Sequence, residues 1–195
     1  MTKPMSPRAA RSRARILAAA TDLLVESGAR SVTVDAVEAT SGVAKSTLYR
    51  HFSSRDDLLV AVIRSALPDV VDADVADGFE PALRQLLALA AEAFADPHWS
   101  RIFPAVLSLR TSMPELDEFV AADKAARQLT LARVLAVGVA EGVLPEPIDI
   151  DVATNVLVGP LVLAAITGAG DGTDATALAE LADYVVDRFV ASFAV

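Results

Sequence analysis

The sequence of residues 31–59 is SVTVDAVEATSGVAKSTLYRHFSSRDDLL, and its pattern predicts short helices joined by tight turns. Thr33 is a suitable N-cap for a helix over residues 34–40, since its hydroxyl can accept a hydrogen bond from a first-turn amide. Gly42 ends that helix, because glycine readily adopts the left-handed backbone conformation of a sharp inter-helix turn. A second helix is therefore expected over residues 44–51.

The second helix has one apolar face and one polar face. Leu48 and Phe52 lie four residues apart and face the core. The remaining surface is hydroxyl-rich and basic, which suits DNA: Lys45, Ser46, Thr47, Tyr49 and Arg50. Ser54, followed by an acid three residues later, caps a third helix that runs to Leu67. This order predicts a helix-turn-helix, in which the second helix enters the major groove. A three-helix packing unit with a solvated polar face is the alternative.

The segment SGVAKSTLYRHF (residues 41–52), followed by Ser-Arg-Asp-Asp-Leu, resembles the N-terminal domain of the TetR family of bacterial transcriptional regulators. The resemblance extends from about Arg13 to Val62, and the rest of the chain is similar to the family in its all-helical character. It implies a DNA-binding regulator, with repression as the family's commonest mode, that dimerises through its last two helices.

The resemblance also implies roles for individual residues. Contacts with phosphates are expected from the amides that begin the helix after Thr33 and from four side chains: Thr33, Lys45, His51 and Arg55. Base edges or neighbouring phosphates are expected to meet four others: Ser46, Thr47, Tyr49 and Arg50. Ser46 should reach deepest because it is small, and Arg50 is the residue suited to a bidentate guanine contact. Specificity is expected to rest partly on DNA shape. His51 could instead be a buried, hydrogen-bonded histidine.

Composition favours an all-α chain that is not an enzyme. Long apolar-periodic segments with few turn residues, and no alternating strand–helix pattern, predict helices throughout. The 195 residues contain no Cys and two His, so no disulfide, thiol nucleophile or Cys-based zinc site is expected. GxSxG, HExxH, P-loop and Rossmann patterns are also missing from the sequence. We therefore expect no catalytic residue, no metal site and no cofactor, and a cytoplasmic location.

Charge is distributed unevenly along the chain. Residues 1–65 hold ten Lys and Arg against six Asp and Glu, a net charge of +4, whereas residues 66–195 hold seven against twenty, a net charge of −13. The local basic region decides phosphate binding. Five cations and no acid occur in the first fifteen residues: Lys3, Arg8, Arg11, Arg13 and Arg15. They predict a basic arm over these fifteen residues that binds phosphates or a minor groove. Residues 1–10 are expected to be mobile and to contain no signal peptide. A solvated tail is the alternative.

Two domains are expected: residues 1–67 for DNA binding, with the basic arm, and residues 68–195 for effector binding and dimerisation. Residues 68–80 are acidic and predict a linker or frayed helix. Helices are then expected over residues 81–96, 98–110, 115–141, 149–167 and 173–194, with a flexible turn at 168–172. The apolar run 156–166 is too short to span a membrane, so we expect a buried or interface helix and no membrane partner.

The expected function is a repressor that a small-molecule effector releases from a palindromic operator. A homodimer through the last two helices would hold two recognition helices roughly 34 to 36 Å apart; a monomer is the alternative. An apolar effector pocket is expected from eight residues, for which ordinary core packing is the alternative: Phe94, Trp99, Phe103, Leu107, Arg110, Met113, Phe119 and Asn155. A ligand-independent regulator, or a helical dimer whose head binds a protein partner, are the competing functions.

Overall fold

The computed structural model describes residues 6–168 and 174–193. Within these residues the chain is α-helical and contains no strand, which confirms the predicted all-α fold. The chain divides into two compact units. The first comprises the described residues up to Leu67 together with Arg101–Asp117, and the second comprises Pro68–Ser100 and the described residues from Glu118 onward. The sequence prediction places residues 101–117 in the second domain, whereas the structure groups them with the first unit.

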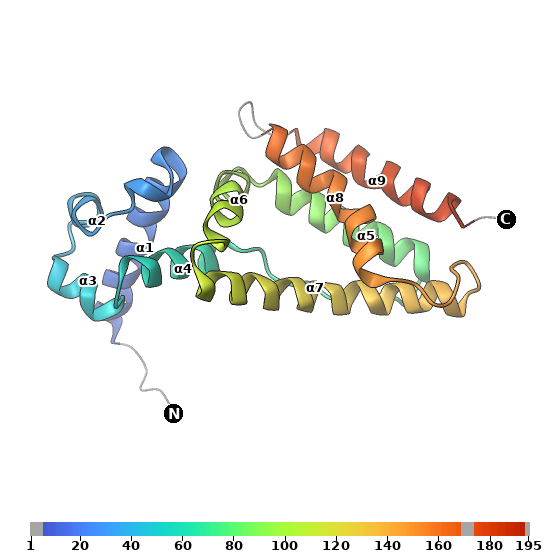
Figure 1. Cartoon of the computed structure of the whole chain (residues 1–195), viewed down its shortest axis with the longest axis horizontal. Coiled ribbons are helices and arrows are strands. Elements are labelled where there is room, and N and C mark those ends of the chain that lie inside the picture. Colours follow the sequence, from blue (N-terminus) through green and yellow to red (C-terminus); the bar gives the residue numbers. More distant parts are fainter. Residues whose placement is uncertain (1–5, 169–173, 194–195) are drawn as a thin grey trace. The chain divides into compact units, whose positions relative to one another are not determined.

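The first unit contains α1 (Pro7–Ser27), α2 (Val34–Ser41), α3 (Lys45–His51) and α4 (Arg55–Ala66), as shown in Figure 1. A 3-10 turn, Ala29–Ser31, connects α1 to α2. The unit also takes in the last part of α6 (Pro97–Arg110) and the first residues of α7 (Pro114–Ala140). Its core combines side chains from the first four helices and Phe52, which directly follows α3, all of them almost completely buried: Ile16, Leu24, Val37, Leu48, Phe52, Leu58 and Ile63.

Local signals set the ends of these helices. The Thr33 hydroxyl accepts a hydrogen bond from the Ala36 amide at the start of α2, and the Ser54 hydroxyl accepts one from the Asp57 amide at the start of α4. Gly42, with a φ of 62°, ends α2 in the left-handed conformation that other residues rarely adopt. The predicted helix-turn-helix bounds are thereby confirmed to within a residue or two.

The second unit is built on α5 (Phe79–Ala95), α8 (Ile150–Gly168) and α9 (Ala175–Ala191), together with most of α7. Helix α5 packs against both α8 and α9, and α8 also lies alongside α9 (Figure 1). The sequence predicts that this helix begins at Pro81, but α5 begins two residues earlier. The helix begins at Phe79 because the Glu141 carboxylate accepts a hydrogen bond from the Phe79 amide at 3.1 Å.

Residues 68–78 form an acidic linker without regular helical structure before α5. Two arginines of α7 hold this linker in the second unit: Arg127 donates a hydrogen bond to the Pro68 carbonyl, and Arg133 pairs with Asp72. The linker is thus attached to α7 at two points six residues apart along that helix. The predicted turn at residues 168–172 lies almost wholly outside the described residues, as do residues 1–5 of the predicted N-terminal arm, which include Lys3.

Helix α8 is, among the described residues, the helix long and apolar enough to cross a membrane, with a mean hydropathy of 1.8 over its most apolar window. Its core-facing residues Ala153, Leu157 and Leu161 pack within the second unit, as predicted for a buried helix. Only 22% of that window is buried, however. An apolar stripe on α8 remains exposed, formed by Val152, Val156, Leu163 and Ile166.

Candidate nucleic-acid interface

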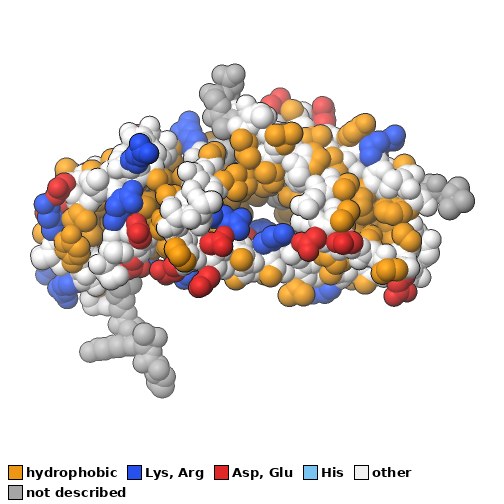
Figure 2. Space-filling view, viewed as in Figure 1, with side chains coloured by type: hydrophobic (Ala, Val, Ile, Leu, Met, Phe, Trp, Pro, Cys, Tyr) orange, Lys and Arg blue, Asp and Glu red, His pale blue; other side chains and the backbone are white. Residues whose placement is uncertain are grey.

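Helix α3 presents a polar face to solvent because its apolar side chain is used for packing. Leu48 is buried against the core of the first unit, and Phe52, directly after the helix, is buried as well. Ser46 and Arg50 are exposed, Thr47 is half-buried and Tyr49 is 56% exposed. The four residues predicted to touch bases or phosphates are therefore not occluded by the core. Lys and Arg side chains are visible on this unit in Figure 2.

Lys45, the first residue of α3, is exposed but already has two acidic partners. Its ammonium group pairs with Asp35 and lies 3.9 Å from Glu38 Oε2, both on α2. The pKa of Lys45 is raised, first because its ammonium donates a hydrogen bond to Asp35 and then because of the negative charge of that carboxylate. Lys45 is thus a charged group at the edge of the polar face, held by two carboxylates of α2.

His51 is half-buried, and its Nε2 lies 2.8 Å from the Ser12 hydroxyl of α1. The contact links the end of α3 to the first helix, 39 residues earlier in the chain. The sequence leaves two roles open for His51, a phosphate contact and a hydrogen bond inside the protein. This geometry favours the hydrogen bond. One ring nitrogen is used inside the unit, so a phosphate contact would depend on the other.

Arg55 lies at the start of α4 and also binds groups within the first unit. Its Nε donates to the Val32 carbonyl at 2.8 Å, and a guanidinium nitrogen donates to the Ala29 carbonyl. A third nitrogen lies 3.4 Å from Asp56. These bonds tie α4 to the 3-10 turn that connects α1 to α2: the Ala29 carbonyl also accepts the Val32 amide within that turn, and the Val32 carbonyl lies just before α2. The structure thus shows a structural role for Arg55 in addition to the predicted phosphate contact.

The basic residues near the N-terminus are helical from Pro7 onward. The Arg13 guanidinium lies over the Phe52 ring, 5.3 Å from its centroid, and Arg15 donates a hydrogen bond to the Ser41 carbonyl at the end of α2. Arg8 and Arg11 are exposed. Two of the cations that the sequence assigns to an arm therefore hold α1 against the helix-turn-helix.

Thr33 is exposed at the start of α2, where its hydroxyl oxygen accepts the Ala36 amide. Its position at a helix N-terminus agrees with the geometry expected for its predicted phosphate contact. The sequence does not identify Asp35, Glu38 and Ser12 as parts of this surface. Asp35 and Glu38 are three residues apart and so share a face of α2, a local signal that points to a common partner. Ser12 has no such signal.

The predicted effector residues are divided between the two units. Phe103, Leu107, Arg110 and Met113 belong to the first unit, and Phe94, Trp99, Phe119 and Asn155 belong to the second. Leu107 and Arg110 line an open surface pocket with Thr111, Pro114 and Asp117, where the Arg110 guanidinium pairs with Asp117 at 2.8 Å. Trp99 and Met113 are buried, while Asn155 is exposed. The effector contacts stay a prediction.

Comparisons with known proteins agree with this architecture. Residues 16–62 match the family described as "Bacterial regulatory proteins, tetR family", and residues 77–185 match the family described as "Tetracyclin repressor-like, C-terminal domain". The sequence is 35% identical over 90 residues to the HTH-type transcriptional activator FasR of Mycolicibacterium smegmatis. That match spans 43% of this chain and 39% of FasR.

Solved structures of similar fold cover most of the chain. The TetR family transcriptional regulator PfmR from Thermus thermophilus is 25% identical, with a TM-score of 0.72 over 89% of this chain and 97% of PfmR. The transcriptional regulator FadR from Bacillus subtilis, in complex with stearoyl-CoA, is 20% identical, with a TM-score of 0.69 over 91% of this chain and 97% of FadR.

Proposed function

Because this chain belongs to the TetR family of bacterial regulatory proteins, we propose that it represses transcription from a palindromic operator and that a small-molecule effector releases it. Membership of the family makes the chain a DNA-binding transcriptional regulator. The observation that carries the proposal is the exposed hydroxyl-rich and basic face of α3, behind which Leu48 and Phe52 are buried. A recognition helix needs one face that is packed on the core and an opposite polar face that is open to DNA.

Selection of bound fragments from a random DNA pool tests the DNA-binding part of the proposal. We expect a two-fold symmetric site, with affinity that falls steeply as salt is added because phosphate contacts release counterions. The variants Tyr49→Ala and Lys45→Ala should bind the selected site more weakly than the parent protein. Equal binding by both variants, or single unpaired half-sites in footprints, would contradict it. If the chain bound no DNA but bound another protein, with an affinity that does not depend on salt, the competing partner-binding function would be favoured.

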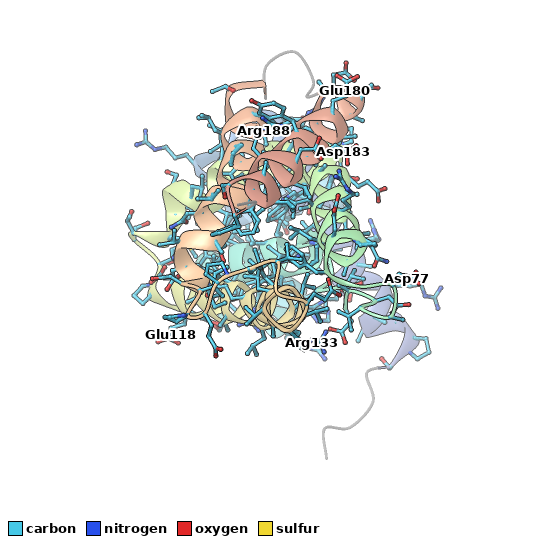
Figure 3. All side chains as sticks on the ribbon, turned by 90° about the vertical axis from the view of Figure 1, so that its right-hand side faces the viewer. Asp77, Glu118, Arg133, Glu180, Asp183 and Arg188 are labelled. Atoms are coloured by element: carbon cyan, nitrogen blue, oxygen red, sulfur yellow. The ribbon has the colours of Figure 1, made fainter. Side chains whose placement is uncertain are left out.

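A homodimer through α8 and α9 is the arrangement that we propose for reading a palindrome. The exposed stripe on α8 is apolar, and Tyr184 on α9 is 61% exposed with the Arg188 guanidinium over its ring. Asp183 and Arg188 lie on different sides of α9 in Figure 3, and Asp183 faces Arg84 of α5 at 3.5 Å. The Tyr184 side of α9 is thus distinct from the side that α5 occupies. Light scattering that shows a monomer at micromolar concentration would contradict the dimer.

The proposed effector acts by population shift. A molecule that binds one conformation of the second unit more tightly would favour that conformation and lower operator affinity by the same coupling free energy. A coupling of about 2.7 kcal/mol weakens DNA binding roughly a hundredfold. Stearoyl-CoA, the ligand in the FadR structure, is the first compound to test in a mobility-shift assay. An operator complex that responds to no compound in a broad panel would indicate a ligand-independent regulator.

The direction of regulation requires its own measurement. FasR, which shares 35% identity over 90 residues, is named an activator. We propose repression for this chain because a dimer seated on an operator blocks polymerase without any further contact. In vitro transcription from a template with the selected operator should fall as protein is added, whereas an increase would show activation. A regulator of this kind works where the chromosome is, so we propose a cytoplasmic location.

A further inference from the structure

The start of α3 lacks a side-chain cap of its own. Ala44 occupies the N-cap position and makes no side-chain hydrogen bond. Glu38 of α2 takes over this role, since its Oε1 accepts the hydrogen bond of the Lys45 amide at 3.0 Å, seven residues along the chain. The first free amide of the recognition helix is therefore satisfied by a carboxylate from the preceding helix, which fixes α3 relative to α2.

The same face of α2 also holds the first cation of α3. Asp35 pairs with the Lys45 ammonium, and the second oxygen of Glu38 lies 3.9 Å from it. These two acids and one lysine form a cluster that we call the Asp35–Glu38–Lys45 triad. The raised pKa of Lys45 agrees with this geometry. All three side chains are partly solvent-exposed, so each remains accessible to DNA.

The triad borders the face of α3 that is proposed to read DNA. Lys45 and Tyr49 are four residues apart and share one side of the helix. A phosphate that approaches this border meets two carboxylates, which repel it, and a lysine whose charge is already compensated. A phosphate that pairs with Lys45 competes with Asp35 for the charge and the N–H donors of the ammonium group. The exchange replaces one ion pair by another, so its net gain is small unless the rest of α3 is seated in the groove.

We propose that Asp35 and Glu38 are specificity-determining residues that restrain Lys45 and position α3, and so weaken binding to non-cognate DNA more than binding to the operator. The inference depends on the proposed role of α3 in DNA reading. A discriminating protein needs such an unfavourable contribution because non-cognate DNA is in large excess over operator sites. Glu38 and Asp35 act through Lys45 and the α3 backbone, and need not touch the DNA themselves.

A double-mutant cycle on Asp35 and Lys45 tests the restraint. Four proteins are compared: parent, Asp35→Asn, Lys45→Gln and the double variant, each titrated with operator duplex and with a scrambled duplex at several salt concentrations. Asp35→Asn should raise affinity for scrambled DNA about two- to fivefold, as expected for the loss of one exposed ion pair. The fall of its DNA affinity with salt should become steeper, by about one released counterion per DNA-binding unit. Operator affinity should rise less, so the operator-to-scrambled ratio should fall.

The Lys45→Gln background separates restraint of Lys45 from a general charge effect. There, Asp35→Asn should change scrambled-DNA affinity by clearly less than it does in the parent. An equal change in both backgrounds, or an equal rise for operator and scrambled DNA, would overturn the proposal. Glu26→Gln removes an exposed acid from α1 and serves as the charge-matched control. If Glu26→Gln shifts the ratio as much as Asp35→Asn does, net charge alone is responsible.

Two variants of Glu38 separate its charge from its capping role. Glu38→Gln keeps an oxygen that can accept the Lys45 amide and should behave like Asp35→Asn. Glu38→Ala removes the acceptor too, so the Lys45 amide should exchange faster with solvent and operator affinity should fall. Unchanged exchange and an unchanged ratio in Glu38→Ala would overturn the positioning role. A parent protein that binds no DNA would refute the proposed function, whereas normal operator binding with an unchanged ratio in Asp35→Asn refutes this inference alone.

Discussion

Helices α3 and α8 each bury one face and expose the other, but they expose opposite kinds of surface. Helix α3 leaves Ser46, Tyr49 and Arg50 to solvent, whereas α8 leaves Val156 and Leu163. Water solvates the polar face of α3 well, so that face is stable without a partner. Exposed apolar surface costs about 25 cal/mol per Å² relative to burial, so the face of α8 favours a lasting cover. The difference agrees with the partners proposed above, which are DNA bound reversibly by α3 and a second copy of the chain that covers α8.

Placing a charge on the exposed face of α8 should give the largest effect. Leu163→Glu removes an apolar contact worth about 1.5–3 kcal/mol on each side of a two-fold interface. We expect the dimer to weaken more than about a hundredfold and operator binding to be lost at ordinary working concentrations. Sedimentation velocity and a mobility-shift assay measure the two effects.

The matched control for that variant is Leu129→Glu on α7. Leu129 is 70% exposed and Leu163 is 63% exposed, so neither change should unfold the protein. Leu129→Glu should remain dimeric and bind the operator. If the protein remains dimeric with Leu163→Glu but becomes monomeric with Leu129→Glu, the dimer interface is formed by α7 and not by α8 and α9.

Two arginines of the first unit should respond differently to truncation. Arg50 is exposed on α3, and Arg50→Ala should weaken operator binding about ten- to a hundredfold at unchanged stability, as for loss of a bidentate base contact. Arg55 instead binds the Val32 and Ala29 carbonyls. Arg55→Ala should therefore lower the free energy of unfolding by about 1–3 kcal/mol. Denaturant titration and DNA binding of both variants are the measurements, and the reverse pattern would contradict these assignments.

A smaller effect is expected where α1 meets the end of α3. Ser12→Ala removes the hydroxyl that lies 2.8 Å from His51 Nε2 and should lower stability by about 0.5–1.5 kcal/mol. Ser65→Ala is the control, because the Ser65 hydroxyl donates to the Val62 carbonyl within its own helix. If both variants unfold at the same denaturant concentration, the contact between Ser12 and His51 contributes nothing to the fold.

The smallest effect concerns an exposed carboxylate at the start of α8. The pKa of Asp151 is lowered because the Gln128 amide and the Lys124 ammonium both donate hydrogen bonds to it. A lowered folded-state pKa means that this carboxylate stabilises the fold above its ordinary pKa and loses that contribution as the pH falls through the lowered value. Asp151→Asn should therefore show a slightly weaker loss of Tm between pH 7 and pH 3 than the parent. Identical pH profiles for the two proteins would exclude this contribution.

The fold was predictable from the sequence because its signals are local. Thr33, Gly42 and Ser54 act on amides and carbonyls within four residues, so the bounds of α2, α3 and α4 follow from the sequence pattern. The site was predictable to the extent that exposure follows from helical spacing. Leu48 is buried, and the residues beside it on α3 are not.

Long-range partners were not predictable. Arg55 reaches carbonyls 23 and 26 residues earlier, and Arg15 reaches the Ser41 carbonyl 26 residues later. No periodicity encodes such pairs, so the sequence pattern assigns a basic residue near the recognition helix to DNA binding even where the fold uses that residue. The effector residues show the same limit, because apolar side chains at helical spacing line a core and a pocket alike.

The discontinuity of the first unit along the chain matters for anyone who builds hybrid regulators. Residues 101–117 belong to the unit that carries α3, and Glu115 lines a pocket with Arg13 and Asp57. A graft that transfers only residues 1–67 onto a foreign effector domain would leave the surface of α1 and α4 around Arg13 and Asp57 without residues 101–117. A hybrid that keeps the whole first unit needs junctions on both sides of residues 101–117 in addition to the one after Leu67. The alternative is a foreign domain in which the segment that contacts α1 and α4 is redesigned to fit them.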